Sequence, residues 1–121
     1  MKKYTYTETK DTRSGFGEGL LEAARENENI VGLCADLTGS LKMNAFENEF
    51  PERFFQVGIS EANMMSMAAG MALSGLRPVV YTITPFTTTR CLEQIRVGVA
   101  YHQAPVVIVG TGSGLSYAEL G

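Results

Sequence analysis

The feature that most constrains the fold is an alternation of short apolar runs with helical segments along the chain. The apolar runs cover residues 30–35, 54–57, 79–84 and 105–110. No hairpin dipeptide such as Asn-Gly joins neighbouring runs. Strands that alternate with helices are typical of a parallel sheet covered on both faces. The sequence therefore predicts an α/β fold, a three-layer α/β/α domain with a mostly parallel central sheet.

Amphipathic segments surround these runs. Apolar residues recur at helical spacing in residues 14–27, 43–50, 60–75 and 87–101. Thr12 or Ser14 is expected to cap the first helix, and Ser60 the third, because hydroxyl side chains favour the N-cap position. Ligands of parallel sheets bind beyond the carboxyl ends of the strands. The loops that open at Asp36 and Gly58, and at residues 84 and 110, are therefore expected to converge on one edge.

The length of 121 residues, with 45% hydrophobic and 19% charged side chains, indicates one soluble domain over residues 1–121. Such a chain buries about two-thirds of its unfolded surface, which forms a core but not two lobes around a ligand. The Gly- and Ser-rich stretch 110–116 follows the last strand where a helix is normally expected. We therefore expect a domain that is incomplete at its C-terminus, from a truncated or split protein, whose active site needs a partner.

Charge and cysteine usage exclude several classes of function. Ten basic residues against 13 acidic ones give a net charge of −3 without a Lys/Arg stripe, which argues against nucleic acid and membrane surfaces as partners. Cys34 and Cys91 lack CxxC spacing, and Cys34 lies in an apolar run, as a buried free thiol does. No signal peptide or membrane-spanning apolar stretch is visible. These features predict a cytoplasmic protein.

Glu61 is the most informative candidate, because it places a carboxylate in the first turn of a helix rich in Met and Ala. The helix N-terminus favours the ionised form by about 0.3–1 kcal/mol, whereas burial against methionines favours the protonated form. From the residues alone, Glu61 is either a poised acid/base group or an ordinary first-turn glutamate that stabilises its helix.

Several motifs resemble one enzyme family. Residues 58–64 read GISEANM and are followed by AAG at residues 68–70, which resembles the GIAEQNM/AAG block of transketolase-like thiamine diphosphate enzymes. Residues 35–40, ADLTGS, resemble the ADLTxS loop, and residues 50–54, FPERF, match the segment before the catalytic glutamate. Residues 82–96 resemble the TFAxFxTxRxxEQIR segment. The blocks follow the family order from residue 13 to residue 121, the extent of the pyrimidine-binding domain.

The resemblance implies the thiamine diphosphate-binding fold and thiamine diphosphate as cofactor. It places the diphosphate site, with its Mg²⁺ or Ca²⁺, on a partner chain that corresponds to the N-terminal section, so that this chain holds no metal itself. It further implies a homodimer or heterotetramer. A transketolase-type transferase (EC 2.2.1.-) is then expected to be active only together with a diphosphate-binding domain.

The resemblance also assigns roles to residues of the cofactor site. Glu61 corresponds to the catalytic carboxyl group that hydrogen-bonds the pyrimidine ring nitrogen. Phe86 corresponds to the aromatic residue that stacks on that ring; alternatively it is a core Phe at a strand end. Asp36 matches an acid near the thiazolium ring, or else it caps the turn after the first strand. Ile83 stands where the family has a first aromatic residue.

Substrate residues follow in the same way. Arg13 and Ser40 match the pair that holds the phosphate of a sugar phosphate, although an isolated Arg before a helix is also commonly solvated. In the last block the chain departs from the family, since Gly112 stands in the place of a substrate-contacting His and Leu120 in the place of an Asp. Recognition of substrate hydroxyl groups is therefore expected to differ.

The sequence thus favours the pyrimidine-binding part of an enzyme that transfers a two-carbon ketol unit between a ketose phosphate and an aldose. Arg13 with Ser40 supports this reading. A deoxyxylulose-phosphate synthase-like enzyme and a 2-oxoacid dehydrogenase beta subunit are alternatives within the superfamily. A non-catalytic assembly domain that binds a partner through its Met-rich face is the alternative outside it.

Overall fold

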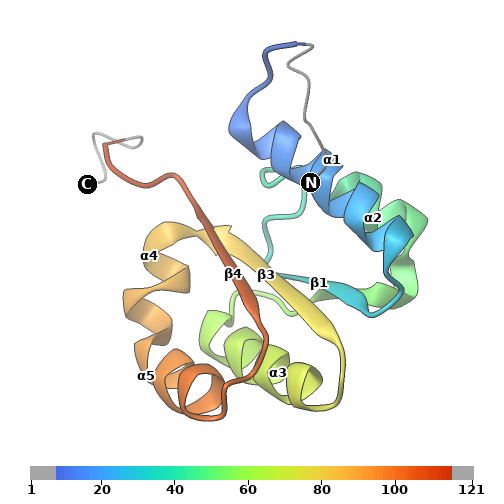
Figure 1. The fold of residues 1–121 in the computed structure, drawn as a ribbon. Coiled ribbons are helices and arrows are strands. Elements are labelled where there is room, and N and C mark those ends of the chain that lie inside the picture. The colour runs from blue at the N-terminus through green and yellow to red at the C-terminus, as the bar shows by residue number, and fades with distance from the viewer. Residues whose placement is uncertain (1–7, 116–121) are drawn as a thin grey trace.

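In the computed structural model, which describes residues 8–115, four strands form one parallel sheet (Figure 1). The strands are β1 (Ile30–Cys34), β2 (Phe54–Gln56), β3 (Arg77–Ile83) and β4 (Val107–Thr111), in the order β2-β1-β3-β4. Every neighbouring pair is parallel. The predicted α/β fold is confirmed.

Helices cover both faces of this sheet, which gives the three layers predicted from the sequence (Figure 1). Helices α1 (Thr12–Glu26) and α2 (Asn44–Glu49) lie on one face. The opposite face is covered by α3 (Glu61–Leu73), α5 (Leu92–Gln94) and the π-helix η3 (Ile95–Tyr101). Helix α4 (Thr84–Thr87) and two 3₁₀ turns, η1 (Pro51–Arg53) and η2 (Thr89–Cys91), complete the elements.

Alternation along the strands divides the interior into two cores. Val79 and Tyr81 of β3 pack with α1 and α2, whereas Val80 between them packs with α3. This is the period of two that a pleated strand imposes. On the α1 side, the rings of Phe16 and Tyr81 meet edge to face with centroids 4.5 Å apart. Met64 and Met65 of α3 are fully buried, so the methionine face is core.

Two expected helix caps differ from the structure. The N-cap of α1 is Asp11, whose carboxylate accepts hydrogen bonds from the backbone N–H and the hydroxyl of Ser14, so neither Thr12 nor Ser14 caps this helix. Ser60 does stand at the N-cap of α3, but its hydroxyl donates to the carbonyl of Val57 at 2.8 Å. The hydroxyl therefore fixes the loop before α3 and makes no side-chain cap bond to the helix.

The register brings the carboxyl ends of the strands to one edge. Cys34 lies beside Gln56 and beside Tyr81, and Ile83 lies beside Thr111. The loops after β1, β2 and β3 therefore open at the same edge, and the chain leaves β4 there as well (Figure 1). No helix within residues 8–115 is long and apolar enough to cross a membrane.

Candidate functional site

Glu61 lies at the carboxyl edge of the sheet, as the first residue of α3. The short loop from β2 turns at Gly58, whose φ of 70° suits a residue without Cβ. Only 4% of Glu61 is exposed. A buried carboxylate needs a charged or hydrogen-bonding partner, since burying an unpaired charge is costly. The partner of Glu61 therefore defines the site.

That partner is Arg90, which reaches across from the 3₁₀ turn η2. Its Nη1 donates to Oε1 of Glu61 at 2.9 Å. The guanidinium carbon of Arg90 also lies 3.8 Å from the centroid of the Phe86 ring, a cation–π contact. Glu61 and Phe86, which the sequence assigned to one site, are thus joined through one side chain. The group that contacts both of them, the Arg90 guanidinium, is planar and donates a hydrogen bond.

Cys91, the residue after Arg90, holds the backbone of Phe86 in this arrangement. Its Sγ donates to the carbonyl of Phe86 at 3.0 Å, and the residue is fully buried. Burial raises the pKa of the Cys91 thiol, and the negative charge of Glu61 raises it further, while Arg90 lowers it. Cys91 therefore stays a neutral thiol that holds the backbone of Phe86.

Gln56 is a site residue that sequence reasoning missed. It is the last residue of β2, and its Oε1 accepts from the backbone N–H of Asp36 at 2.5 Å and from that of Gly58 at 3.2 Å. Its Nε2 donates to the Thr38 hydroxyl at 3.0 Å. One amide side chain thus joins the loop after β1 to the loop before Glu61. A polar residue at the end of a short apolar strand was the available signal.

Asp36 follows β1 on this edge in a left-handed conformation, with φ of 57°. The residue is exposed, and its backbone N–H is held by Gln56. Capping of the turn after β1 was one of two alternatives for Asp36, and in the structure the amide side chain of Gln56 holds this turn at the Asp36 backbone N–H. The carboxylate of Asp36 lies on an exposed residue at the same edge as Glu61.

Arg13 and Ser40 lie next to each other although 27 residues separate them. Nη1 of Arg13 donates to the backbone carbonyl of Ser40 at 3.2 Å, and Nε lies 3.8 Å from the Asp11 carboxylate. This hydrogen bond is accepted by the backbone carbonyl of Ser40, so the Ser40 hydroxyl takes no part in it. Both residues are exposed, so the guanidinium and the hydroxyl are accessible to an anion from solvent.

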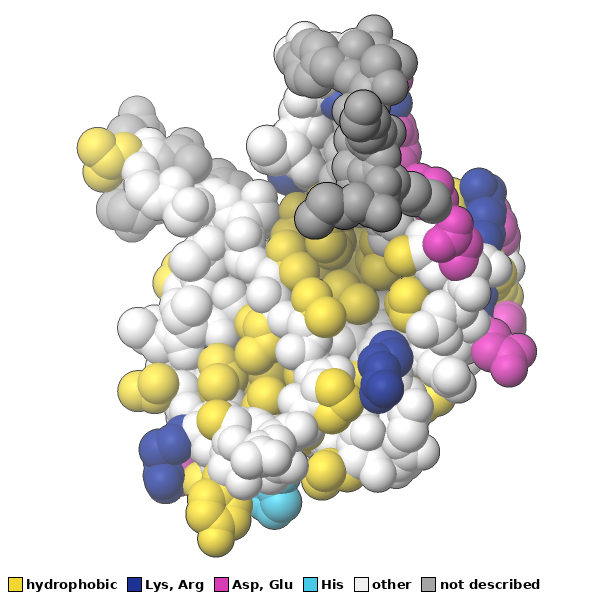
Figure 2. All heavy atoms as spheres, viewed as in Figure 1, with side chains coloured by type: hydrophobic (Ala, Val, Ile, Leu, Met, Phe, Trp, Pro, Cys, Tyr) yellow, Lys and Arg dark blue, Asp and Glu magenta, His cyan; other side chains and the backbone are white. Residues whose placement is uncertain are grey.

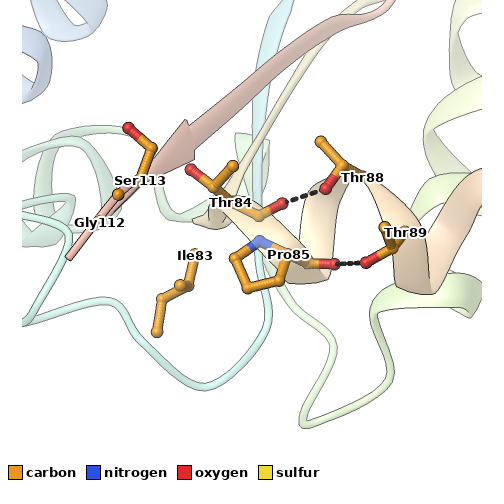
Figure 3. Close-up of a pocket in the computed structure, with 8 residues that line it drawn as sticks. Ile83, Thr84, Pro85, Thr88, Thr89, Gly112 and Ser113 are labelled. Carbon is orange, nitrogen blue, oxygen red and sulfur yellow. Dashed lines mark hydrogen bonds between the residues drawn. The ribbon is translucent and has the colours of Figure 1, made fainter. Parts of the chain in front are cut away.

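A pocket of about 310 Å³ lies at the ends of β3 and β4 (Figure 3). Its lining comes from residues 83–85, from Thr88 and Thr89, and from residues 112–114. The hydroxyls of Thr88 and Thr89 donate to the carbonyls of residues 84 and 85, the two bonds drawn in Figure 3. Gly112, with φ of 67°, stands in the pocket where the family motif has a His. Neither Glu61 nor Phe86 lines this pocket.

Metal ligands were not expected on this chain. Among the described residues, no three His, Cys, Asp or Glu side chains lie together as a metal site requires. The expected substitution at Leu120 lies outside the described residues.

Comparison with known proteins identifies the family. A family model described as the transketolase pyrimidine-binding domain matches residues 8–121. The chain belongs to this family. Within it, the chain is 44% identical over 112 residues to a putative transketolase C-terminal section of Methanocaldococcus jannaschii, covering 93% of this chain and 35% of that protein. It is 39% identical over 103 residues to 1-deoxy-D-xylulose-5-phosphate synthase of Mycobacterium sp. strain KMS, covering 85% and 16%.

A solved structure agrees with the fold. It is described as a split-gene transketolase in an inactive beta4 tetramer, and it matches with a TM-score of 0.75 and 41% sequence identity over 82% of this chain. The chain covers 33% of that protein. This transketolase pyrimidine-binding domain thus spans about a third or less of the length of these relatives.

Proposed function

We propose that this domain supplies the pyrimidine half of a thiamine diphosphate site in a transketolase-type transferase (EC 2.2.1.-). The reaction is the transfer of a two-carbon ketol unit from a ketose phosphate to an aldose. A partner chain with the diphosphate-binding domain holds Mg²⁺ or Ca²⁺, and the assembly is a homodimer or heterotetramer in the cytoplasm. The observation that carries this proposal is the buried carboxylate of Glu61, joined to the ring of Phe86 through the guanidinium of Arg90.

The chemistry of these two side chains fits an aminopyrimidine. Bound thiamine diphosphate supplies the nucleophilic carbon that the protein itself lacks. Glu61 would share a proton with the ring nitrogen through its carboxyl oxygen, and Phe86 would offer a flat apolar face. The contact of the Arg90 guanidinium with both side chains supports the fit, because it is itself a planar hydrogen-bond donor. Asp36 would face the thiazolium side.

The pair formed by Arg13 and Ser40 supports a phosphorylated substrate. A guanidinium and a hydroxyl together can donate several hydrogen bonds to one phosphate. The synthase relative named above keeps a second candidate open. In that candidate, a 2-oxoacid loses carbon dioxide and the remaining fragment condenses with an aldehyde. A 2-oxoacid dehydrogenase-like enzyme would use the same donor class. Arg13 with Ser40 favours ketol transfer, and a donor assay separates the candidates.

The test uses the complex of this chain with its diphosphate-binding partner. Glu61→Gln keeps the shape of the side chain and removes its ability to share a proton as an acid/base group. We expect ketol transfer to fall about 10²–10⁴-fold, the usual contribution of a positioned acid/base group. Turnover is measured with a ketose phosphate and, in parallel, with a 2-oxoacid donor.

Complex formation is measured on the same samples, because it separates catalysis from assembly. A complex that forms normally but loses turnover supports the proposal. If Glu61→Gln leaves turnover unchanged in a normally formed complex, the chain is an assembly domain and the proposal is wrong. Release of carbon dioxide from a 2-oxoacid, without ketol transfer, would instead favour the synthase or dehydrogenase candidate.

A further inference from the structure

We propose that Arg90 acts as an intramolecular placeholder for the pyrimidine ring, and that the ring must displace it in order to bind. This inference rests on the proposed function, since it assumes that the ring stacks on Phe86 and bonds to Glu61. It adds a competing group that lies within the chain itself and that sets how tightly the cofactor binds.

The first argument is geometric. The guanidinium of Arg90 makes the two contacts that the proposed function assigns to the ring: a hydrogen bond to Oε1 of Glu61 at 2.9 Å, and a stack at 3.8 Å on Phe86. Both contacts come from one planar group, which lies on one face of the Phe86 ring and bonds to the Glu61 carboxylate at the same time. Two planar groups cannot occupy that face and that oxygen at once. Binding of the ring therefore requires Arg90 to leave.

The second argument concerns the exposure of the two partners. The Arg90 side chain is 46% exposed, whereas the Glu61 side chain is 5% exposed. A half-exposed guanidinium can move into water at small cost, but a buried carboxylate at the start of a helix cannot follow it. The side chain that moves is therefore Arg90, and Glu61 stays in place to receive the ring.

The third argument explains why such a group is present. A buried carboxylate without a partner is costly, because the interior does not solvate its charge. Arg90 compensates the charge of Glu61 and covers the face of Phe86. The site is thus stable and ordered before the partner chain delivers the cofactor.

The alternative is that Arg90 stays on Glu61 in the loaded site and orients the carboxylate. The two roles give opposite signs in a binding experiment. If Arg90 competes with the ring, its removal strengthens binding of the cofactor. If Arg90 orients Glu61 for the ring, its removal weakens binding.

The experiment measures the Kd of thiamine diphosphate, by calorimetric titration at saturating Mg²⁺, on the complex with the diphosphate-binding partner after cofactor has been dialysed out. Arg90→Met keeps the stem of the side chain and removes the charge and the plane. We expect binding about tenfold tighter, since an ion pair and a cation–π contact no longer compete. Arg25→Met is the control, because it breaks the ion pair of Arg25 with Glu49 on the opposite face of the sheet. It is expected to leave the Kd unchanged.

A second variant and a structural measurement protect the test against misfolding. Arg90→Lys keeps a cation but loses the planar fork, so an intermediate Kd is expected. A crystal structure of the loaded wild-type complex is expected to show the Arg90 guanidinium off Phe86. The placeholder role is wrong if the Kd of Arg90→Met is unchanged or higher than that of the wild type. It is also wrong if Arg90 remains on Glu61 beside bound cofactor. Either result leaves the proposed function intact. A wild-type complex that does not bind thiamine diphosphate overturns both.

Discussion

At the scale of single residues, Arg13 in the first turn of α1 and Ser40 in the loop after β1 offer an anion two exposed donors. In the proposed enzyme, Arg13→Met would remove a charge-assisted hydrogen bond to the substrate phosphate. Such bonds contribute about 1.5–3 kcal/mol. We therefore expect KM for a ketose phosphate to rise by about 10- to 100-fold, with kcat little changed, because the phosphate is remote from the reacting carbon. Steady-state kinetics of the assembled enzyme measures both constants.

An unphosphorylated substrate provides the control for Arg13. The KM of an aldehyde acceptor without phosphate is expected to be the same in Arg13→Met and in the wild type. If KM for both substrates rises equally, Arg13 supports the fold of α1 and does not bind phosphate. Ser40→Ala is expected to act in the same direction with a smaller effect, because it removes a neutral donor.

The sequence predicted individual site residues better than it predicted their partners. The position of Glu61 at the start of a helix follows from a local pattern, and the structure confirms it. The partnership of Glu61 with Arg90 joins residues 29 positions apart, and that of Gln56 with Asp36 joins residues 20 apart. Such pairs depend on how the strands are ordered and on where loops end, and local spacing does not contain that information. Asp36 and Phe86 remain predictions as cofactor contacts.

At the scale of elements, the approach of α1 to the loop after β1 depends on Gly17. A Cβ at Gly17 would clash with the backbone carbonyl of Lys42, which cannot move aside as a side chain could. This loop also contains Ser40, so the close approach places Ser40 beside Arg13. We expect Gly17→Ala to destabilise the chain by about 1–3 kcal/mol, as overpacking does. Urea unfolding followed by circular dichroism measures the change.

Gly19 on the same helix is the matched control. A Cβ at Gly19 meets nothing within 4 Å. Gly19→Ala is therefore expected to stabilise the chain by about 0.5–1 kcal/mol, because alanine has less conformational freedom to lose on folding than glycine. Two stabilising substitutions, or two destabilising ones, would contradict the role given to the packing at Gly17.

The segment predicted as one helix over residues 87–101 shows where periodicity fails. The structure begins this segment earlier, at Thr84, and divides it into α4, η2, α5 and the π-helix η3. The hydroxyls of Thr87 and Thr88 both donate to the carbonyl of Thr84. Short polar side chains that bond to the preceding turn compete with regular helical hydrogen bonds. The spacing of apolar residues in the sequence predicted a regular helix. The competing hydrogen bonds come from hydroxyl groups, which do not change that spacing, so periodicity alone could not reveal them.

At the scale of the whole molecule, the carboxyl edge of the sheet combines the candidate site with exposed apolar side chains. Ile59 is 77% exposed and lies two residues before Glu61. A partner that delivers a ring to Glu61 must approach this edge. In the view of Figure 2, hydrophobic side chains are more widespread than charged ones over the middle of the molecule. The partner is therefore expected to bury Ile59 as part of an apolar contact.

Replacing Ile59 by Ser tests this docking direction. Burial of an Ile side chain contributes about 1.5–3 kcal/mol, so loss of the contact is expected to weaken binding of the diphosphate-binding chain by about 10- to 100-fold. Tyr101 is similarly exposed, at 80%, but ends η3 at the opposite edge, before β4 begins. Tyr101→Ser is expected to leave this affinity unchanged. Analytical ultracentrifugation over a range of partner concentrations measures both.

Activity at high partner concentration then separates docking from damage to the site. If Ile59 acts only in docking, an excess of the partner chain restores the turnover of Ile59→Ser, because mass action refills the complex. If the substitution instead disturbs the turn that leads into α3, turnover stays low in a fully formed complex. A greater loss of affinity in Tyr101→Ser than in Ile59→Ser would show that the partner binds the other edge of the sheet. The carboxylate of Glu61 would then be out of its reach, and the shared site proposed here could not form.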